Sequence, residues 1–168
     1  MEEYWWKSHG SRPKGKDWGF VIPATLVFVL ALLVTAWDFV YVQGIIYRFG
    51  IVSLVGLALF VVGVFIRLMA RRNLGEYFSH GLRTLQKPEL ITYGIYKHVR
   101  HPAYLGSLLL SPGISLIFSS LYGFFLMLGL IPCFLYRIRI EEKMLIEKFG
   151  DEYREFIKKT KKMISYIY

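Results

Sequence analysis

Residues 103–136 read AYLGSLLLSPGISLIFSSLYGFFLMLGLIPCFLY, a stretch of 34 positions without one formally charged side chain. An α-helix needs about 20 apolar residues to cross a bilayer, so this stretch is too long for one span and just long enough for two short ones. Ser119, Ser120 and Gly123 offer turn chemistry near its middle, and we expect the break between residues 118 and 123. The stretch therefore predicts two membrane-spanning helices joined as a tight hairpin.

Two further uncharged runs precede the hairpin, at residues 19–37 and 49–66. Each is long enough to cross the hydrocarbon of a bilayer. The first run follows 18 mostly polar residues, a longer leader than a cleaved signal peptide has, so we expect a retained helix. The expected fold is an all-α membrane protein with one domain, residues 1–168. It has four transmembrane helices, a C-terminal helical hairpin and a cytoplasmic amphipathic tail helix.

The composition of the chain points to the same class of protein. Of its 168 residues 55% are hydrophobic and 17% aromatic, and the mean hydropathy is +0.41, too apolar for an ordinary soluble domain. The formal net charge of +9 flanks the apolar runs, which suits an anionic membrane surface better than nucleic acid. A single cysteine, Cys133, excludes an internal disulfide and a Cys-rich metal site, and we expect no bound metal.

The distribution of Lys and Arg predicts the orientation in the membrane. Of the 21 basic residues, four precede the first run, Arg48 alone lies between the first two runs, seven lie in residues 67–102, and nine lie from Arg137 onward. Cytoplasmic connections carry the excess of positive charge, so both termini should be cytoplasmic. The two long polar segments, residues 67–102 and 137–168, should then meet at the cytoplasmic face, where we expect the chemistry.

The tail should continue the last span as a helix from Arg137 to Phe149 and stop at Gly150. Asp151 is a plausible N-cap for a second helix. In this helix Lys158, Lys159, Lys161 and Lys162 oppose an apolar side formed by Tyr153, Phe156, Ile157, Met163 and Ile164. That pattern predicts a helix lying on an anionic leaflet.

Polar residues gather where the third span begins, in the segment YGIYKHVRHPAY at residues 93–104. Gly94 indicates a turn, and Pro102 suits the first position of a helix because its missing amide hydrogen costs nothing there. The free backbone amides at the start of that helix would donate hydrogen bonds to an anion or a lone pair, and His101 lies beside them. The alternative is a collar of Tyr, His and Arg side chains that anchors lipid headgroups.

A second polar group follows the fourth span. On a continuous helix Glu141 shares one stripe with Arg137 and otherwise apolar residues. An ionised group near hydrocarbon costs about 2 to 3 kcal/mol, so Glu141 needs a partner. The partner is either Arg137, in a plain helix ion pair, or a cationic ligand.

The two groups together form a recognisable pattern. The spacing GxYxxxRHPxYxG from Gly94, followed after one hairpin by EExxLxxxFGxxY from Glu141, resembles the isoprenylcysteine carboxyl methyltransferase family and its relatives, the phospholipid N-methyltransferases. The resemblance covers residues 90–162. It implies an integral membrane enzyme that uses S-adenosyl-L-methionine, held between the cytoplasmic end of the hairpin and the tail.

The resemblance also implies roles for single residues. Glu141 matches a cofactor-binding glutamate, and Arg137 matches an arginine on the substrate side. The other implied cofactor-binding residues are Leu90, Ile91, Tyr96, His101, Pro102, Ala103 and Tyr104. The implied substrate is lipophilic: the carboxylate of a prenylated cysteine or a similar lipid, or a lipid amine.

The chemistry of the two acceptors differs. A carboxylate needs no general base, and Arg137 would orient it by a forked contact. An amine must lose a proton, which Glu142 or His101 could take. Arg137, Glu142 and His101 are therefore the candidate catalytic residues.

Two other functions stay open. The segment RHPAYLG at residues 100–106 and the ending YIY at residues 166–168 also resemble NADPH-dependent membrane reductases of the sterol or steroid type, although Ser107 stands where these usually carry an acid. A non-enzymatic membrane scaffold, whose basic tail recruits partners or anionic lipid, is the third possibility. Binding of each cofactor separates the first two functions, and alanine substitution of Glu141 or His101 tests the third.

Overall fold

The computed structural model describes residues 14–43, 49–74 and 90–163 of the chain. These residues form helices and no strand, which confirms the all-α class. The elements are α2 (Lys14–Trp37), the π-helical η1 (Asp38–Gln43), α3 (Ile51–Leu74), the 3₁₀ turn η3 (Gly94–Lys97), α4 (Pro102–Ile117), α5 (Leu121–Leu128), α6 (Leu130–Phe149) and α7 (Asp151–Lys159).

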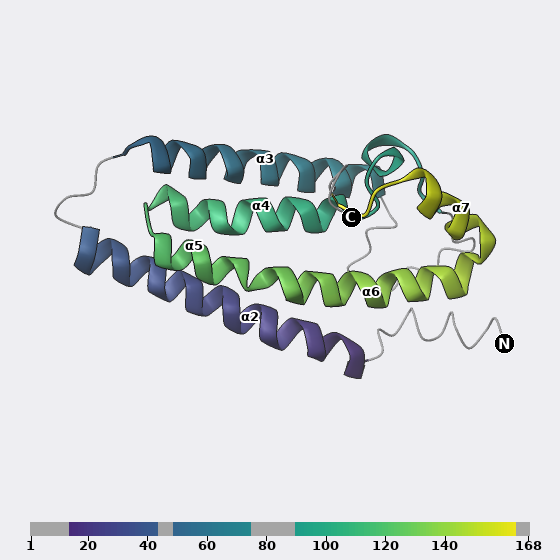
Figure 1. Cartoon of the computed structure of the whole chain (residues 1–168), viewed down its shortest axis with the longest axis horizontal. Coiled ribbons are helices and arrows are strands. Elements are labelled where there is room, and N and C mark those ends of the chain that lie inside the picture. The colour runs from purple at the N-terminus through teal and green to yellow at the C-terminus, as the bar shows by residue number, and fades with distance from the viewer. Residues whose placement is uncertain (1–13, 44–48, 75–89, 164–168) are drawn as a thin grey trace.

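The long helices lie side by side as an elongated bundle (Figure 1). Helix α4 runs through its middle, with α3 along one side and α5 and α6, end to end, along the other. Helix α2 packs mainly on α5 and α6. At one end of the bundle α7 folds back from the end of α6 toward the start of α4 (Figure 1).

The expected hairpin is present, and its turn lies where the sequence predicts it. Helix α4 ends at Ile117 and α5 begins at Leu121. Ser119 adopts a left-handed backbone conformation with φ 56°. The hydroxyl of Ser120 caps α5 by accepting a hydrogen bond from the amide of Gly123 at 3.1 Å.

The helix after the turn is interrupted at Gly129, between α5 and α6. Pro132 explains the interruption, because it lacks the amide hydrogen that would bond the carbonyl of Leu128 and its ring crowds that carbonyl. Pro112, by contrast, lies inside α4, which continues through it.

Three segments are long and apolar enough to cross a membrane: Gly19–Val42, Ile51–Leu74 and Leu121–Phe149. The helix Pro102–Ile117 is apolar but shorter. Helix α3 continues eight residues past Ile66, where we expected its uncharged run to end. Arg67, Arg71 and Arg72 therefore lie on the helix and not in the connection that follows.

Helices α3 and α4 approach each other through glycines. A Cβ atom at Gly63 would lie 2.6 Å from the carbonyl oxygen of Gly106, and one at Gly106 would lie 2.6 Å from the carbonyl oxygen of Gly63. Gly56 on α3 and Gly113 on α4 extend the same seam, with similarly short distances to the opposite helix. Small residues allow this close backbone contact between membrane helices. The seam holds the start of α4 against the last turns of α3.

The tail departs from expectation in two ways. Gly150, with φ 55°, is the residue before α7, so Asp151 is the first helical residue and not the N-cap. Tyr153 and Phe156 are buried against the protein, at 1% and 9% exposed, because α7 folds back onto the bundle; the apolar side of α7 therefore does not lie on a leaflet. Helix α7 ends at Lys159, which leaves Met163 beyond it.

Some sequence predictions fall outside the described residues. These are the Ile164 position, the YIY ending at residues 166–168, and the basic residues before Lys14, at Arg48, and at Arg83 and Lys87.

Candidate active site

The segment before α4 is seated on the end of α3. Gly94 has φ +61°, a backbone conformation that strains residues with a side chain, and a Cβ atom there would also clash with the side-chain amide of Asn73. Ile91 and Tyr96 are buried in one cluster with Ala70 of α3. Ala103 packs against this cluster. Three of the predicted cofactor residues, Ile91, Tyr96 and Ala103, therefore lie in one apolar cluster.

The chain returns to this segment after α7. The amide of Arg100 donates to the carbonyl of Lys161 at 2.9 Å, and the amide of His101 donates to the carbonyl of Lys162 at 3.1 Å. The amide of Lys161 donates to the carbonyl of His98 at 3.0 Å, which completes a short parallel bridge. The residues after α7 therefore lie directly beside the start of α4.

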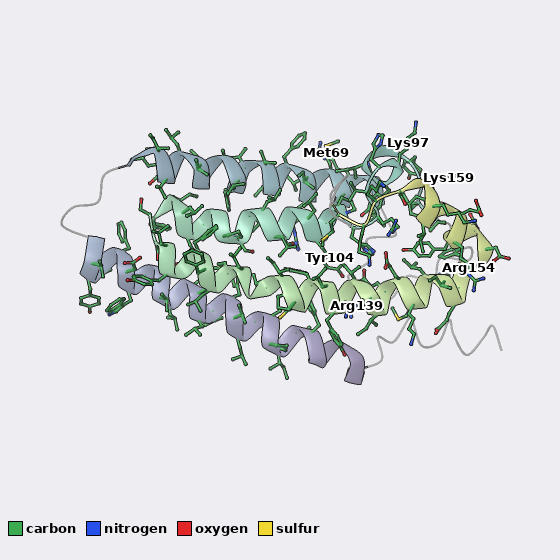
Figure 2. The ribbon with its side chains drawn as sticks, viewed as in Figure 1. Met69, Lys97, Tyr104, Arg139, Arg154 and Lys159 are labelled. Atoms are coloured by element: carbon green, nitrogen blue, oxygen red, sulfur yellow. The ribbon has the colours of Figure 1, made fainter. Side chains whose placement is uncertain are left out.

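Glu141 joins α6 to α4. Its Oε1 accepts hydrogen bonds from the Tyr104 hydroxyl and from Nε of Arg137, the latter at 3.2 Å. Its Oε2 lies 3.8 Å from Nδ1 of His101. Figure 2 shows Tyr104 between α4 and α6, at the level of this contact. The helix start and the paired acids predicted from the sequence therefore lie together.

Glu142 is bonded on both oxygens. Its Oε1 lies 3.1 Å from Nε of Arg100 and 3.5 Å from Nε2 of His101. Its Oε2 lies 3.2 Å from Nζ of Lys162. Two cations from distant parts of the chain thus neutralise this carboxylate, which is 15% exposed. His101 stands between Glu141 and Glu142.

Aromatic rings extend the site from α4 across α6 to α2. The rings of His101 and Tyr104 are stacked with centroids 5.9 Å apart, and Tyr104 contacts Phe134 at 5.4 Å. Phe134 in turn contacts Phe20 of α2 at 5.6 Å, and the Arg137 guanidinium lies 5.8 Å from the Phe20 ring centre. This wall offers π faces to a cation and an apolar surface to a lipid.

Two tyrosines beside the acids remain neutral at physiological pH. Burial, and then the charge of Glu141, raises the pKa of Tyr96 well above its ordinary value. Burial, followed by the charge of Glu142, likewise raises the pKa of Tyr153. Both side chains therefore carry a neutral hydroxyl and not a phenolate.

A second guanidinium reaches α4 from the opposite side. Nη1 of Arg67 donates to the hydroxyl of Ser107, and that hydroxyl bonds the carbonyl of Ala103 at 3.0 Å. Ser107 lies one helical turn beyond Tyr104, which contacts the acid on α6. Arg67 of α3 thus bonds Ser107, while Arg137 of α6 bonds Glu141, which also accepts from Tyr104. Helices α3 and α6 lie on the two sides of α4 (Figure 1).

Most of the residues in this arrangement were predicted from the sequence. The structure brings His101, Tyr104, Arg137, Glu141 and Glu142 together, and it places Pro102, fully buried, at the first position of α4. Leu90 is half-buried at the start of the described segment.

Arg67, Arg100 and Lys162 were not predicted as site partners. Arg100 carried a signal, since it directly precedes His101 in the quoted pattern. No sequence signal pointed to Arg67 or Lys162, because each contacts its partner only through tertiary packing.

Residues 51–152 match the family model described as phospholipid methyltransferase. The chain belongs to this family. The matched residues run from the first residue of α3 into α7 and include His101, Tyr104, Arg137 and both acids of the site. They exclude Phe20 and Lys162.

Individual relatives carry a narrower description. A probable protein-S-isoprenylcysteine O-methyltransferase of Oryza sativa subsp. indica is 34% identical over 125 residues, which cover 71% of this chain and 64% of the relative. The protein-S-isoprenylcysteine O-methyltransferase of Saccharomyces cerevisiae is 32% identical over 111 residues, 64% of this chain and 46% of the relative. Both agree with the resemblance stated from the sequence.

The fold has a solved counterpart. The structure of a eukaryotic intramembrane Ras methyltransferase, an isoprenylcysteine carboxyl methyltransferase, aligns with a TM-score of 0.67 at 27% identity. The alignment covers 85% of this chain and 52% of the other. The chain thus spans about half to two thirds of the length of the relatives it matches.

Proposed function

We propose that this protein transfers a methyl group from S-adenosyl-L-methionine to the carboxylate of a lipophilic acceptor, a prenylated cysteine or a similar lipid. The observation that carries the proposal is the contact of Glu141 with Tyr104, Arg137 and His101, which joins two apolar helices at a charged centre. A partly buried carboxylate beside aromatic rings is the chemistry that a sulfonium cation requires.

The residues present fit this cofactor. Glu141 supplies negative charge, and the faces of Tyr96 and Tyr104 suit a sulfonium and an adenine. The amides at the start of α4 suit a carboxylate. His101 is 6% exposed and lies beside both acids, so its ring borders the place proposed for the donor. When bound, the cofactor supplies an electrophilic methyl group.

The arrangement of cations favours a carboxylate acceptor. Arg137 lies beside Glu141 and Arg67 beside Ser107 on the other side of α4, so each side offers a guanidinium, and a guanidinium holds a carboxylate through paired hydrogen bonds. Methylation of a carboxylate oxygen needs no general base. Glu142, predicted as a proton acceptor for an amine, has both oxygens bonded by Arg100 and Lys162, so its role in this proposal is to anchor the site.

The proposal includes a position in the membrane. Helix α4, although short, forms a fourth crossing as one half of the hairpin, and α2, α3 and the α5–α6 segment form the other three. The charged end of the bundle, with α7 and the acids, lies at the cytoplasmic face, as do both termini. The excess of Lys and Arg at that end supports this orientation.

The two other functions have less support. The relatives named above are described as methyltransferases, which favours methyl transfer over reduction by NADPH. In a non-enzymatic scaffold nothing would require two acids and the three cations that pair with them to lie together at the end of the apolar helices. Removing these charges from water costs free energy.

The test uses the full chain in lipid nanodiscs. Equilibrium dialysis with radiolabelled S-adenosyl-L-methionine and with NADPH should show binding of the first alone. Incubation with the labelled donor and either S-farnesylcysteine or phosphatidylethanolamine should then label the farnesylcysteine. The label should be released by mild alkali, which cleaves a methyl ester and leaves an N-methyl group intact. An alkali-stable product, or binding of NADPH alone, would contradict the proposal.

A further inference from the structure

The residues after α7 form part of the site although they lie outside the matched family segment. We call residues 160–162 the strap. Its backbone bonds the amides of Arg100 and His101 through the carbonyls of Lys161 and Lys162, at 2.9 and 3.1 Å. The backbone of His101 is thus held from one side by the strap while its ring faces the two acids on the other.

Arg100 secures the beginning of the strap. Its Nη1 donates to the carbonyls of Ile157 at 3.1 Å and Thr160 at 2.5 Å, at the end of α7. The last carbonyls of a helix have no hydrogen-bond partner within the helix itself. Its Nε reaches Glu142 at 3.1 Å. A cation at a helix C-terminus is favourable, and this one also connects α7 to α6. The Arg100 side chain is 8% exposed, so these contacts are shielded from water.

Lys162 secures the end of the strap. Its Nζ lies 3.2 Å from Oε2 of Glu142, and the two side chains are 17% and 15% exposed. The other lysines nearby differ in this respect: Lys159 and Lys161 are exposed. Lys162 is therefore the strap lysine whose charge is directed inward, onto an acid that touches His101.

We propose that Lys162 is a positioning residue for the cofactor site: by pairing with Glu142 it closes the strap over the start of α4 and holds His101 in the orientation that receives the methyl donor. The inference rests on the proposed function and deepens it. Lys162 acts through Glu142 and the His101 backbone, so it should affect how tightly the donor binds more than how fast a bound donor reacts.

The decisive variant is Lys162→Glu, which places a carboxylate against Glu142. The conservative variant is Lys162→Arg, and the matched control is Lys159→Glu, which makes the same charge change on an exposed residue three positions away. All are made in the full chain in nanodiscs. Two measurements are taken: the dissociation constant of S-adenosyl-L-methionine with kcat at saturating donor, and amide hydrogen exchange of the donor-free protein.

We expect Lys162→Glu to weaken donor binding about tenfold, the scale of one charge-assisted contact, while kcat at saturation changes less than twofold. Exchange should accelerate in peptides covering residues 98–104 and 157–163 and stay unchanged over α3. Lys162→Arg and Lys159→Glu should behave as the unmodified protein.

Three outcomes would overturn the inference. Unchanged exchange at residues 98–104 in Lys162→Glu would show that the pair does not close the strap. An equal effect of Lys159→Glu would show that only net charge matters. Faster exchange across α3 and α4 as well would make Lys162 a general stability residue. The exchange measurement needs no donor, so it remains decisive even if the unmodified protein binds no S-adenosyl-L-methionine, a result that would defeat the proposed function separately.

Discussion

Glu141 connects the two helices that meet at the site. It accepts hydrogen bonds from Tyr104 and Arg137 and lies beside His101, so it joins α4 to α6 while remaining 26% exposed. A hydrogen-bonded carboxylate in a poorly solvated place is costly to alter, because its partners lose their acceptor. The proposed function requires its negative charge as well as its shape.

Substitution Glu141→Gln separates charge from shape. The amide keeps the size and one acceptor oxygen but removes the charge that a sulfonium or ammonium group would meet. We expect the dissociation constant of S-adenosyl-L-methionine to rise about 100-fold. Equilibrium dialysis measures it, with Glu147→Gln, an exposed position on the same helix, as the control. Donor binding that persists unchanged in Glu141→Gln would argue against a role for this carboxylate.

Substitution of Arg67 tests whether this residue binds the carboxylate of the methyl acceptor. Lysine preserves the charge but cannot form the paired contact of a guanidinium, so Arg67→Lys should raise KM for a prenylated cysteine about tenfold and leave donor binding unaltered. Steady-state kinetics with each substrate varied in turn provide the measurement. Arg72→Lys, at an exposed position on α3, is the control. A KM equal to that of the unmodified protein would exclude Arg67 from acceptor binding.

At the scale of elements, the glycine seam between α3 and α4 determines where the site residues stand. Gly63 and Gly106 bring the two backbones into direct contact, and Arg67 and Ser107 bond just beyond them. Any increase in the separation of the two helices would also move His101 and Tyr104, because both lie in the first turn of α4 or just before it.

Gly63→Ala should therefore destabilise the protein by about 1 to 3 kcal/mol, the usual cost of overpacking. The added Cβ would lie 2.6 Å from the Gly106 carbonyl oxygen and from the Leu110 amide nitrogen, and neither backbone atom can move aside without shifting a helix. The thermal midpoint in detergent reports the change. Gly19→Ala on α2 is the control, because its nearest neighbour, the Tyr136 hydroxyl, is 3.6 Å away. Equal midpoints for the two variants would show that the seam tolerates separation.

At the scale of the whole molecule, the bundle has two unlike ends. One end holds η1 and the turn between α4 and α5, and the other holds η3, α7 and the charged site (Figure 1). Four crossings with the basic end in the cytoplasm would place these two ends on opposite sides of the membrane.

Cysteine labelling tests this orientation. In a Cys133→Ser background, Glu155→Cys on α7 and Gly50→Cys, just before α3, introduce thiols at exposed positions outside the apolar segments. A membrane-impermeant maleimide applied to intact cells should label Gly50→Cys alone, and applied to inside-out vesicles it should label Glu155→Cys alone. Labelling of both from one side would contradict the proposed four crossings.

The parts of this protein that could be predicted from sequence are those that depend on neighbouring residues. The uncharged runs predicted α2, α3 and the hairpin, and the Ser119–Ser120 turn lies in the predicted interval, because helix formation and turn chemistry act over a few positions. The limits of α3 and the direction faced by α7 were not predictable in this way. Both depend on the surface against which each helix packs.

The charged centre shows the same division. The charge pattern by itself predicted that the segment with His101 and the segment with the two acids lie at the same end of the apolar helices, and the family resemblance implied that they share one site. Only the tertiary structure decided their partners: Glu142 meets Lys162 across 20 positions, Arg67 meets Ser107 across 40, and Arg100 meets Thr160 across 60. Contacts at such separations form only after the helices have packed, because no local preference of the chain brings these residues together.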